Sequence, residues 1–108
     1  MDMVTRFEVH LVALDPTIGS EIKKTRPCVI ISPDEMNRHL KTVVIAPLTS
    51  TIKNYPTRVA LTFQGKSGEI VLDQLRTVDK RRLVKKLGTI SRKAQIATSR
   101  ILIEMFEL

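Results

Sequence analysis

The stretch Thr42-Val43-Val44-Ile45-Ala46-Pro47-Leu48 decides the fold. It is apolar at nearly every position, so both faces of an extended strand would be buried, and such a strand belongs at the centre of a sheet. Pro47 has no backbone N–H to donate to a neighbour and therefore predicts a bulge or a strand end. The chain on either side must supply the strands that cover this one.

One strand and the entrance of another are expected before the central strand. Residues 7–14 alternate between two faces, and the turn residues 15–20 end them. Arg26-Pro27 then opens the β-branched run at residues 28–32, and Arg26 should be extended because a residue before proline avoids the helical region. Residues 33–37 are expected to form a short helical turn.

A hairpin and a helix are expected after the central strand. Residues 58–63 alternate, residues 64–68 contain two glycines typical of a tight turn, and residues 69–75 return as a strand. Residues 77–87 are compatible with either a helical turn or short strands. Ser91 is a suitable N-cap for a C-terminal helix whose apolar residues recur at a period near 3.6.

About five short strands followed by one helix predict a mainly β protein with helices (α+β). The expected architecture is a small SH3-like barrel or bent antiparallel sheet with the C-terminal helix packed on it. The 108 residues suit a single domain spanning residues 1–108, and the hydrophobic fraction of 43% argues against disorder.

The charge of the chain favours a polyanionic partner. The net charge is +7, and residues 76–93 contain eight lysine and arginine residues against Asp79 alone. Nucleic acid is the commonest partner of such a surface and an acidic protein the next, although part of the run could serve solubility only.

Other classes of function are disfavoured. No apolar run approaches the roughly 18 residues of a membrane span, and the N-terminus has no apolar signal segment, so we expect a cytoplasmic protein without membrane contact. The lone Cys28 excludes a disulfide framework, and His10 and His39 lack metal-ligand spacing. We expect neither a metal site nor a cofactor.

Polar residues at strand ends are the candidate site, because a rigid scaffold presents its functional groups there. Structural roles remain open for some of them: Arg26 could pair with Glu21 or Asp73, Thr49 could cap a turn, and Gln74 could satisfy buried backbone. The residues are Ser20, Arg26, Thr49, Asp73, Gln74 and Arg76.

Three blocks of the sequence resemble the MazF/PemK family of toxin endoribonucleases. The first joins Leu14-Asp15-Pro16-Thr17-Ile18-Gly19-Ser20-Glu21 to Thr25-Arg26-Pro27-Cys28-Val29-Ile30-Ile31-Ser32-Pro33-Asp34. The second is Ala46-Pro47-Leu48-Thr49-Ser50. The third is Ile70-Val71-Leu72-Asp73-Gln74-Leu75-Arg76-Thr77-Val78-Asp79-Lys80-Arg81-Arg82-Leu83. The similarity spans about residues 6–105, with the blocks in the family's order and spacing.

The resemblance implies a metal-independent, sequence-selective endoribonuclease that is the growth-inhibiting toxin of a type II toxin–antitoxin pair. It also implies a CcdB/PemK-like fold, a homodimer, and neutralisation by a cognate antitoxin with an acidic, flexible C-terminal segment. Two alternatives lie outside catalysis: a basic RNA-binding module and a topoisomerase-binding module of the same fold.

The resemblance also implies roles for individual residues. Arg26 and Thr49 match the family's catalytic arginine and threonine, and Ser20 and Gln74 match RNA-contacting positions. Charge adds Lys23, Lys24 and Arg76 as RNA-binding candidates, and Tyr55 is the candidate for stacking on a base. The acid or base that assists catalysis is left open among Glu21, His10 and Asp73.

Three positions depart from the family pattern. Most members begin this region with Arg-Gly-Asp or Arg-Gly-Glu and an aromatic residue, whereas Phe7 stands here in place of the glycine and His10 departs as well. Val71 stands where some PemK-type members have an arginine.

The expected chemistry uses the 2′-hydroxyl of RNA as nucleophile. Arg26 would offer two donors to the non-bridging oxygens of the phosphate, and the Thr49 hydroxyl a third. The products would be a 2′,3′-cyclic phosphate and a 5′-hydroxyl.

Overall fold

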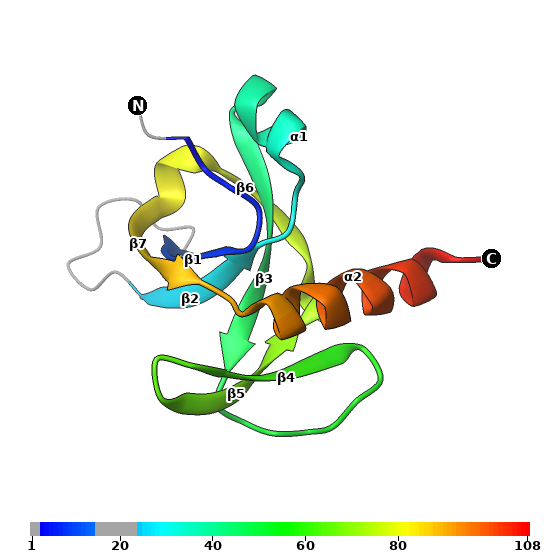
Figure 1. Ribbon diagram of the computed structural model, residues 1–108. Helices are drawn as coiled ribbons and strands as arrows, with labels where there is room; N and C mark the ends of the chain where they lie inside the picture. Colours follow the sequence, from blue (N-terminus) through cyan, green and yellow to red (C-terminus); the bar gives the residue numbers. More distant parts are fainter. Residues whose placement is uncertain (1–2, 15–23) are drawn as a thin grey trace.

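The computed structural model describes residues 3–14 and 24–108 (Figure 1). Its strands are β1 (Glu8–Ala13), β2 (Thr25–Ile30), β3 (Thr42–Thr49), β4 (Arg58–Phe63), β5 (Lys66–Val71), β6 (Arg76–Asp79) and β7 (Leu83–Thr89). Its helices are α1 (Asp34–His39), α2 (Arg92–Phe106) and the short 3₁₀ helices η1 (Leu72–Gln74) and η2 (Lys80–Arg82). The described part is thus a mainly β structure that ends in its longest helix.

The strands form one curled antiparallel sheet in which β3 is central, as expected. The order is β4-β5-β3-β2-β1-β7, and β6 pairs with β3 outside this path (Figure 1). Along one edge β3 pairs with β2; along the other it pairs first with β6 up to Ile45 and then with β5 from Leu48. Pro47 lies where β3 passes from one neighbour to the next, a place where a missing N–H donor is tolerated.

Several local predictions are confirmed. The tight turn expected at residues 64–68 is found but is shorter, since residues 64 and 65 form it with positive φ angles of 51° and 78°, as a two-residue hairpin loop requires. Gly68 lies within β5, which begins at Lys66. The Ser91 side chain accepts a hydrogen bond from the Ala94 amide and so caps α2. The expected bent sheet with a C-terminal helix is the observed architecture.

The strand prediction for residues 69–75 is wrong at its second half. The strand stops at Val71, and residues 72–74 form η1 before β6 begins at Arg76. Both readings of the basic segment are found, since η2 lies between β6 and β7. The sheet therefore has seven strands in the described residues instead of the expected five.

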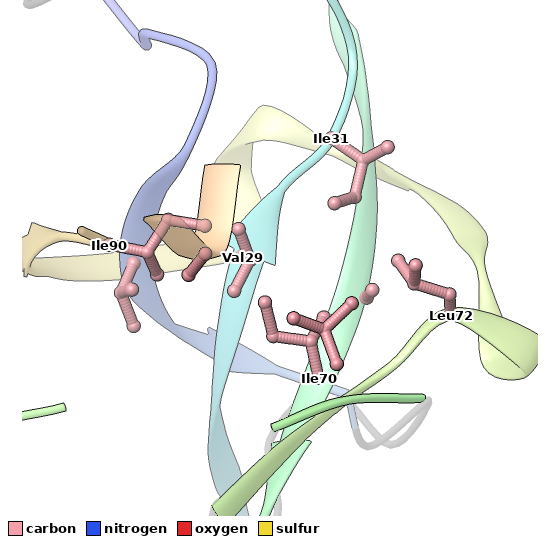
Figure 2. Close-up of a cluster of buried hydrophobic side chains, with 9 residues drawn as sticks. Val29, Ile31, Ile70, Leu72 and Ile90 are labelled. Atoms are coloured by element: carbon pink, nitrogen blue, oxygen red, sulfur yellow. The ribbon is translucent and has the colours of Figure 1, made fainter. Parts of the chain in front are cut away.

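Two clusters of buried apolar side chains, one layer on each face, pack against the sheet. The larger joins the sheet to α2 and includes Val29, Ile70, Leu72 and Ile90, all at most 2% exposed (Figure 2). The smaller lies on the other face and consists of Val12, Cys28, Ile30, Val43, Ile45 and Val78. Truncating one large side chain in such a layer costs about 2–5 kcal/mol, so these residues fix the strands that carry the site. No helix in the described ranges is long and apolar enough to cross a membrane.

Candidate active site at the ends of strands β2 and β3

The register of β2 and β3 brings Arg26 and Thr49 to the same end of the sheet. The last pair in this ladder is Cys28 with Pro47. Arg26 lies two residues beyond Cys28, and Thr49 lies two residues beyond Pro47. Because side chains alternate along a strand, both residues lie on the face that carries Cys28 and the smaller apolar layer.

Arg26 and Thr49 line one pocket of about 430 Å³. Its walls come from β2, the end of β3 and the β4–β5 hairpin, and its apolar part from Leu61, Phe63 and Leu87. Arg26 is exposed and Thr49 is half-buried. The pocket thus combines a solvent-accessible guanidinium with a hydroxyl fixed at a strand end, which is a suitable arrangement for binding a phosphate.

The Thr49 hydroxyl is oriented by the chain that follows it. The Thr51 amide donates a hydrogen bond to Thr49 Oγ1 at 3.1 Å. This contact is the turn-capping role that the sequence left open. It uses an acceptor position of the hydroxyl, so the O–H proton stays available for another acceptor.

Two arginines lie near the Cys28 thiol. Burial raises the pKa of Cys28 to about 11, against the opposing effect of the positive charges of Arg26 and Arg76. Arg76 is exposed and pairs with Ile45 across β6 and β3, which places it on the same face as Arg26. Arg76 therefore adds positive charge near Cys28, although it does not line the Arg26–Thr49 pocket.

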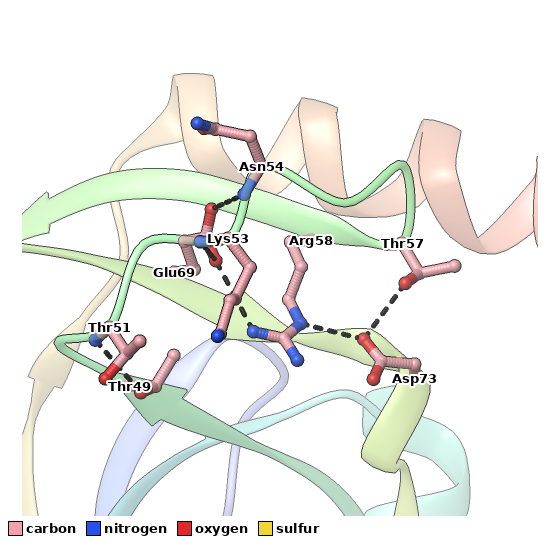
Figure 3. A network of polar contacts seen from close by, with 8 residues as sticks. All are labelled: Thr49, Thr51, Lys53, Asn54, Thr57, Arg58, Glu69 and Asp73. Atoms are coloured by element: carbon pink, nitrogen blue, oxygen red, sulfur yellow. Dashed lines mark hydrogen bonds and ion pairs between the residues drawn. The ribbon is translucent and has the colours of Figure 1, made fainter.

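Asp73 pairs with Arg58, a partner that the sequence did not reveal. Arg58 Nε lies 2.9 Å from Asp73 Oδ1, and the Thr57 hydroxyl donates to the same oxygen at 2.9 Å (Figure 3). The Arg58 hydrogen bond lowers the pKa of Asp73. In the described part of the chain no carboxylate pairs with Arg26, so the suggested Arg26–Asp73 pair is wrong.

Arg58 is one of two residues that the sequence reasoning missed, the other being its partner Glu69. Arg58 begins β4 opposite Val71. From there it reaches Asp73 and Glu69, and its guanidinium lies 5.0 Å from the centre of the Tyr55 ring. The only signal in the sequence was one polar residue in an alternating strand, which does not distinguish an ion pair from a solvated side chain.

His10 lies in a different pocket. Its Nε2 is 3.0 Å from Glu8 Oε1, and Lys86 Nζ is 3.0 Å from Glu8 Oε2. Burial raises the pKa of Glu8, but the hydrogen bonds from His10, Thr5 and Lys86 outweigh it and leave a lowered value. This pocket, of about 400 Å³, is lined by β1 and β7 and does not include Arg26 or Thr49.

The remaining candidates are spread around the site. Tyr55 is exposed in the loop after β3, Gln74 is exposed in η1, and Lys24 is exposed just before β2. Ser20, Glu21 and Lys23 lie outside the described residues. Within residues 3–14 and 24–108, no three His, Cys, Asp or Glu side chains gather where they could hold one metal ion.

Comparison with known proteins gives a family and a set of similar structures. The family described as PemK-like, MazF-like toxin of type II toxin–antitoxin system matches residues 5–106. The chain is 38% identical over 100 residues to Endoribonuclease MazF of Staphylococcus epidermidis, covering 87% of this chain and 83% of that protein.

Two of the similar solved structures are mycobacterial. An endoribonuclease is 26% identical with a TM-score of 0.82, over 100% of this chain and 95% of that one. An endoribonuclease in complex with its cognate antitoxin is 25% identical with a TM-score of 0.83, over 97% and 96%. The likeness therefore extends over nearly the whole of each chain and well beyond the pocket.

Proposed function

Because the chain belongs to the PemK-like, MazF-like family of type II toxin–antitoxin toxins, we propose that it is a toxin endoribonuclease that cleaves single-stranded RNA at the Arg26–Thr49 pocket. The observation that carries the proposal is that these two side chains line one pocket with no described carboxylate paired to the guanidinium. The whole of residues 1–108 would act as one toxin domain.

The cleavage we propose needs no metal ion, because the substrate brings its own nucleophile. The ribose 2′-hydroxyl gives its proton to water and attacks the adjacent phosphorus. The bond to the 5′-oxygen breaks, this oxygen takes a proton from water, and a 2′,3′-cyclic phosphate and a 5′-hydroxyl result. The transition state carries extra negative charge on the phosphate oxygens. Arg26 donates two parallel hydrogen bonds to those oxygens and Thr49 donates one, and each preorganised donor contributes about 10²–10³ in rate.

Donor positioning therefore accounts for most of the rate in this proposal. Of the acid and base candidates, Asp73 is bound by Arg58 and His10 by Glu8, and neither lines the Arg26–Thr49 pocket. Glu21 belongs to the segment before β2. We assign the catalytic roles to Arg26 and Thr49 alone.

RNA would approach along the basic surface around the pocket. Lys24, Tyr55 and Arg76 are exposed, Gln74 leads into β6, and we propose all four as RNA contacts. Ser20 and Lys23 belong to the same group of proposed RNA contacts. Because the lysines and arginines would neutralise phosphates, the affinity should fall with salt at a slope of about −0.7 per phosphate contact.

The partners follow from the family and the charge. A relative has been solved with its cognate antitoxin, and the net charge of +7 suits a partner with an acidic, flexible segment. We further propose that the toxin is a homodimer. Sedimentation of the purified protein at micromolar concentration should give twice the mass of the 12.2 kDa chain.

Cleavage of RNA in EDTA tests the proposal. The wild-type protein should cut a long single-stranded RNA at defined sites and leave cyclic-phosphate and 5′-hydroxyl ends. The variant Arg26→Ala should lose about 10²–10³ in rate, whereas Arg100→Ala, which removes an exposed arginine of α2, should cleave normally. Binding without cleavage would favour the non-catalytic module, and cleavage that stops in EDTA would contradict the metal-independent mechanism.

A further inference from the structure

The loop that follows Thr49 is held by a buried carboxylate. Residues 50–57 connect β3 to β4, and Glu69 lies on β5 directly opposite Thr49 in the β3–β5 ladder. The Glu69 side chain is only 1% exposed. Its Oε1 accepts a hydrogen bond from the Lys53 amide at 3.1 Å, and its Oε2 accepts one from the Asn54 amide at 3.0 Å (Figure 3).

Arg58 fixes the other end of the same loop. Its guanidinium lies 3.5 Å from Glu69 and 2.9 Å from Asp73, so one arginine joins the two carboxylates (Figure 3). The hydrogen bond from the Lys53 amide is the largest cause of the lowered pKa of Glu69. Glu69 is therefore an ionised group with a partner at each oxygen.

Burying a carboxylate costs desolvation free energy, which a buried apolar side chain in the same strand would not cost. Well-packed apolar residues of similar volume are often as stabilising as a buried ion pair, or more so. The neighbouring residues of β5, Ile70 and Val71, are buried apolar side chains. We therefore expect Glu69 to act on the loop that it binds, in addition to stabilising the strand.

We propose that Glu69 is a positioning residue for Thr49 and acts through the loop. By fixing the Lys53 and Asn54 amides, Glu69 sets the path of the chain just before them, including Thr51. The Thr51 amide then occupies one acceptor position of Thr49 Oγ1 and leaves the hydroxyl proton for the phosphate. This inference rests on the proposed function, because only the proposed function gives Thr49 a substrate phosphate to bind.

The effect of Glu69 on cleavage is measured with two substitutions. Glu69→Val removes both acceptors, and Glu69→Gln keeps one of them. We expect kcat to fall about 10–100-fold for Glu69→Val and by an intermediate factor for Glu69→Gln, while KM changes less than about threefold. The matched control Glu104→Gln alters an exposed glutamate of α2 and should leave both constants unchanged.

A second arm asks whether Glu69 acts through Thr49. In a Thr49→Val background, Glu69→Gln should cause no further loss of kcat, whereas a general structural role would lower the residual rate again. If Glu69→Val does not fold, Glu69→Gln alone decides. A kcat equal to that of the wild type, or an equal loss in the Thr49→Val background, would overturn the proposal.

Amide hydrogen exchange separates this inference from the proposed function, because it needs no RNA. The Lys53 and Asn54 amides should exchange slowly in the wild-type protein although both residues are exposed, and faster in Glu69→Gln. If the wild-type protein does not cut RNA but these amides are protected, the proposed function fails while the binding of the loop by Glu69 is supported. Fast exchange of these amides in the wild type would overturn the binding of the loop by Glu69.

Discussion

Replacing Gly68 with alanine tests whether cleavage depends on the position of the end of β3. A Cβ at Gly68 would lie 2.4 Å from the carbonyl oxygen of Thr49, a distance that real contacts do not reach. The clashing atom belongs to the Thr49 backbone, so no change of side-chain rotamer can relieve the contact. The alanine must therefore push β5 and the end of β3 apart.

The size of the displacement follows from the contact distances. Ordinary contact begins at 3.4 Å, so the two strands must move apart by about 1 Å, and a misplacement of that size at a catalytic group costs about 10²-fold in rate. Overpacking of this kind destabilises a fold by about 1–3 kcal/mol. We expect Gly68→Ala to remain folded at 25 °C and to cleave RNA about 10²-fold more slowly.

Gly65→Ala on the same hairpin is the matched control. Its backbone has a φ of 78°, and a Cβ there meets nothing within 4 Å. The strain costs about 1–2 kcal/mol but leaves Thr49 where it is. The assay compares single-turnover cleavage rates with urea unfolding curves of both variants. Equal cleavage by two folded alanine variants would refute the claim that the position of Thr49 controls the rate.

Three further predictions concern groups whose surroundings the structure defines. Because burial raises the pKa of Cys28 to about 11, the native thiol should react with a maleimide at pH 8 at least about 10²-fold more slowly than the urea-unfolded thiol; equal rates would contradict its burial. Glu8 and Glu69 have lowered pKa values in the folded protein, so their stabilisation is complete above the pKa of the unfolded chain, about 4.3, and is lost as the pH falls further. Urea unfolding between pH 3 and 7 should show this decline, and Glu69→Val should flatten it. Ile70→Ala should lower the unfolding free energy by about 2–5 kcal/mol, since Ile70 is fully buried in the larger layer; a loss below 1 kcal/mol would contradict that packing.

Local signals in the sequence were sufficient for most of the elements. The apolar stretch at residues 42–48 identified the central strand, and the Ser91 cap identified the start of the C-terminal helix. Two glycines between alternating strands identified the β4–β5 hairpin. Each of these features depends on residues close together in the chain, so each can be read without knowledge of the fold.

The path of residues 69–79 could not be predicted because it depends on a change of partner. The alternation continues through residue 75, yet the chain leaves β4 at Val71 and pairs with the first half of β3 from Arg76. The 3₁₀ helix η1 makes this transfer. Nothing local marks the point at which one neighbour is exchanged for another.

The candidate site was predictable only in part. The Arg-Pro and Pro-Leu-Thr blocks identified Arg26 and Thr49 as candidates, and the sheet register brings them to one pocket. Glu69 and Arg58 were missed because a charged residue in a hairpin strand is usually solvated. Their burial is created by the loop at residues 50–57, which covers them only in the folded chain.

A double-mutant cycle between Arg26 and Thr49 is the most direct test of the account. Single-turnover cleavage in EDTA would be compared for the wild type, Arg26→Ala, Thr49→Val and the double variant, each checked for folding. We predict that each single substitution slows cleavage by about 10²–10³ and that the double variant loses much less than the product, since both groups serve one phosphate. Near-normal cleavage by either folded single variant, or losses that simply multiply, would contradict the account.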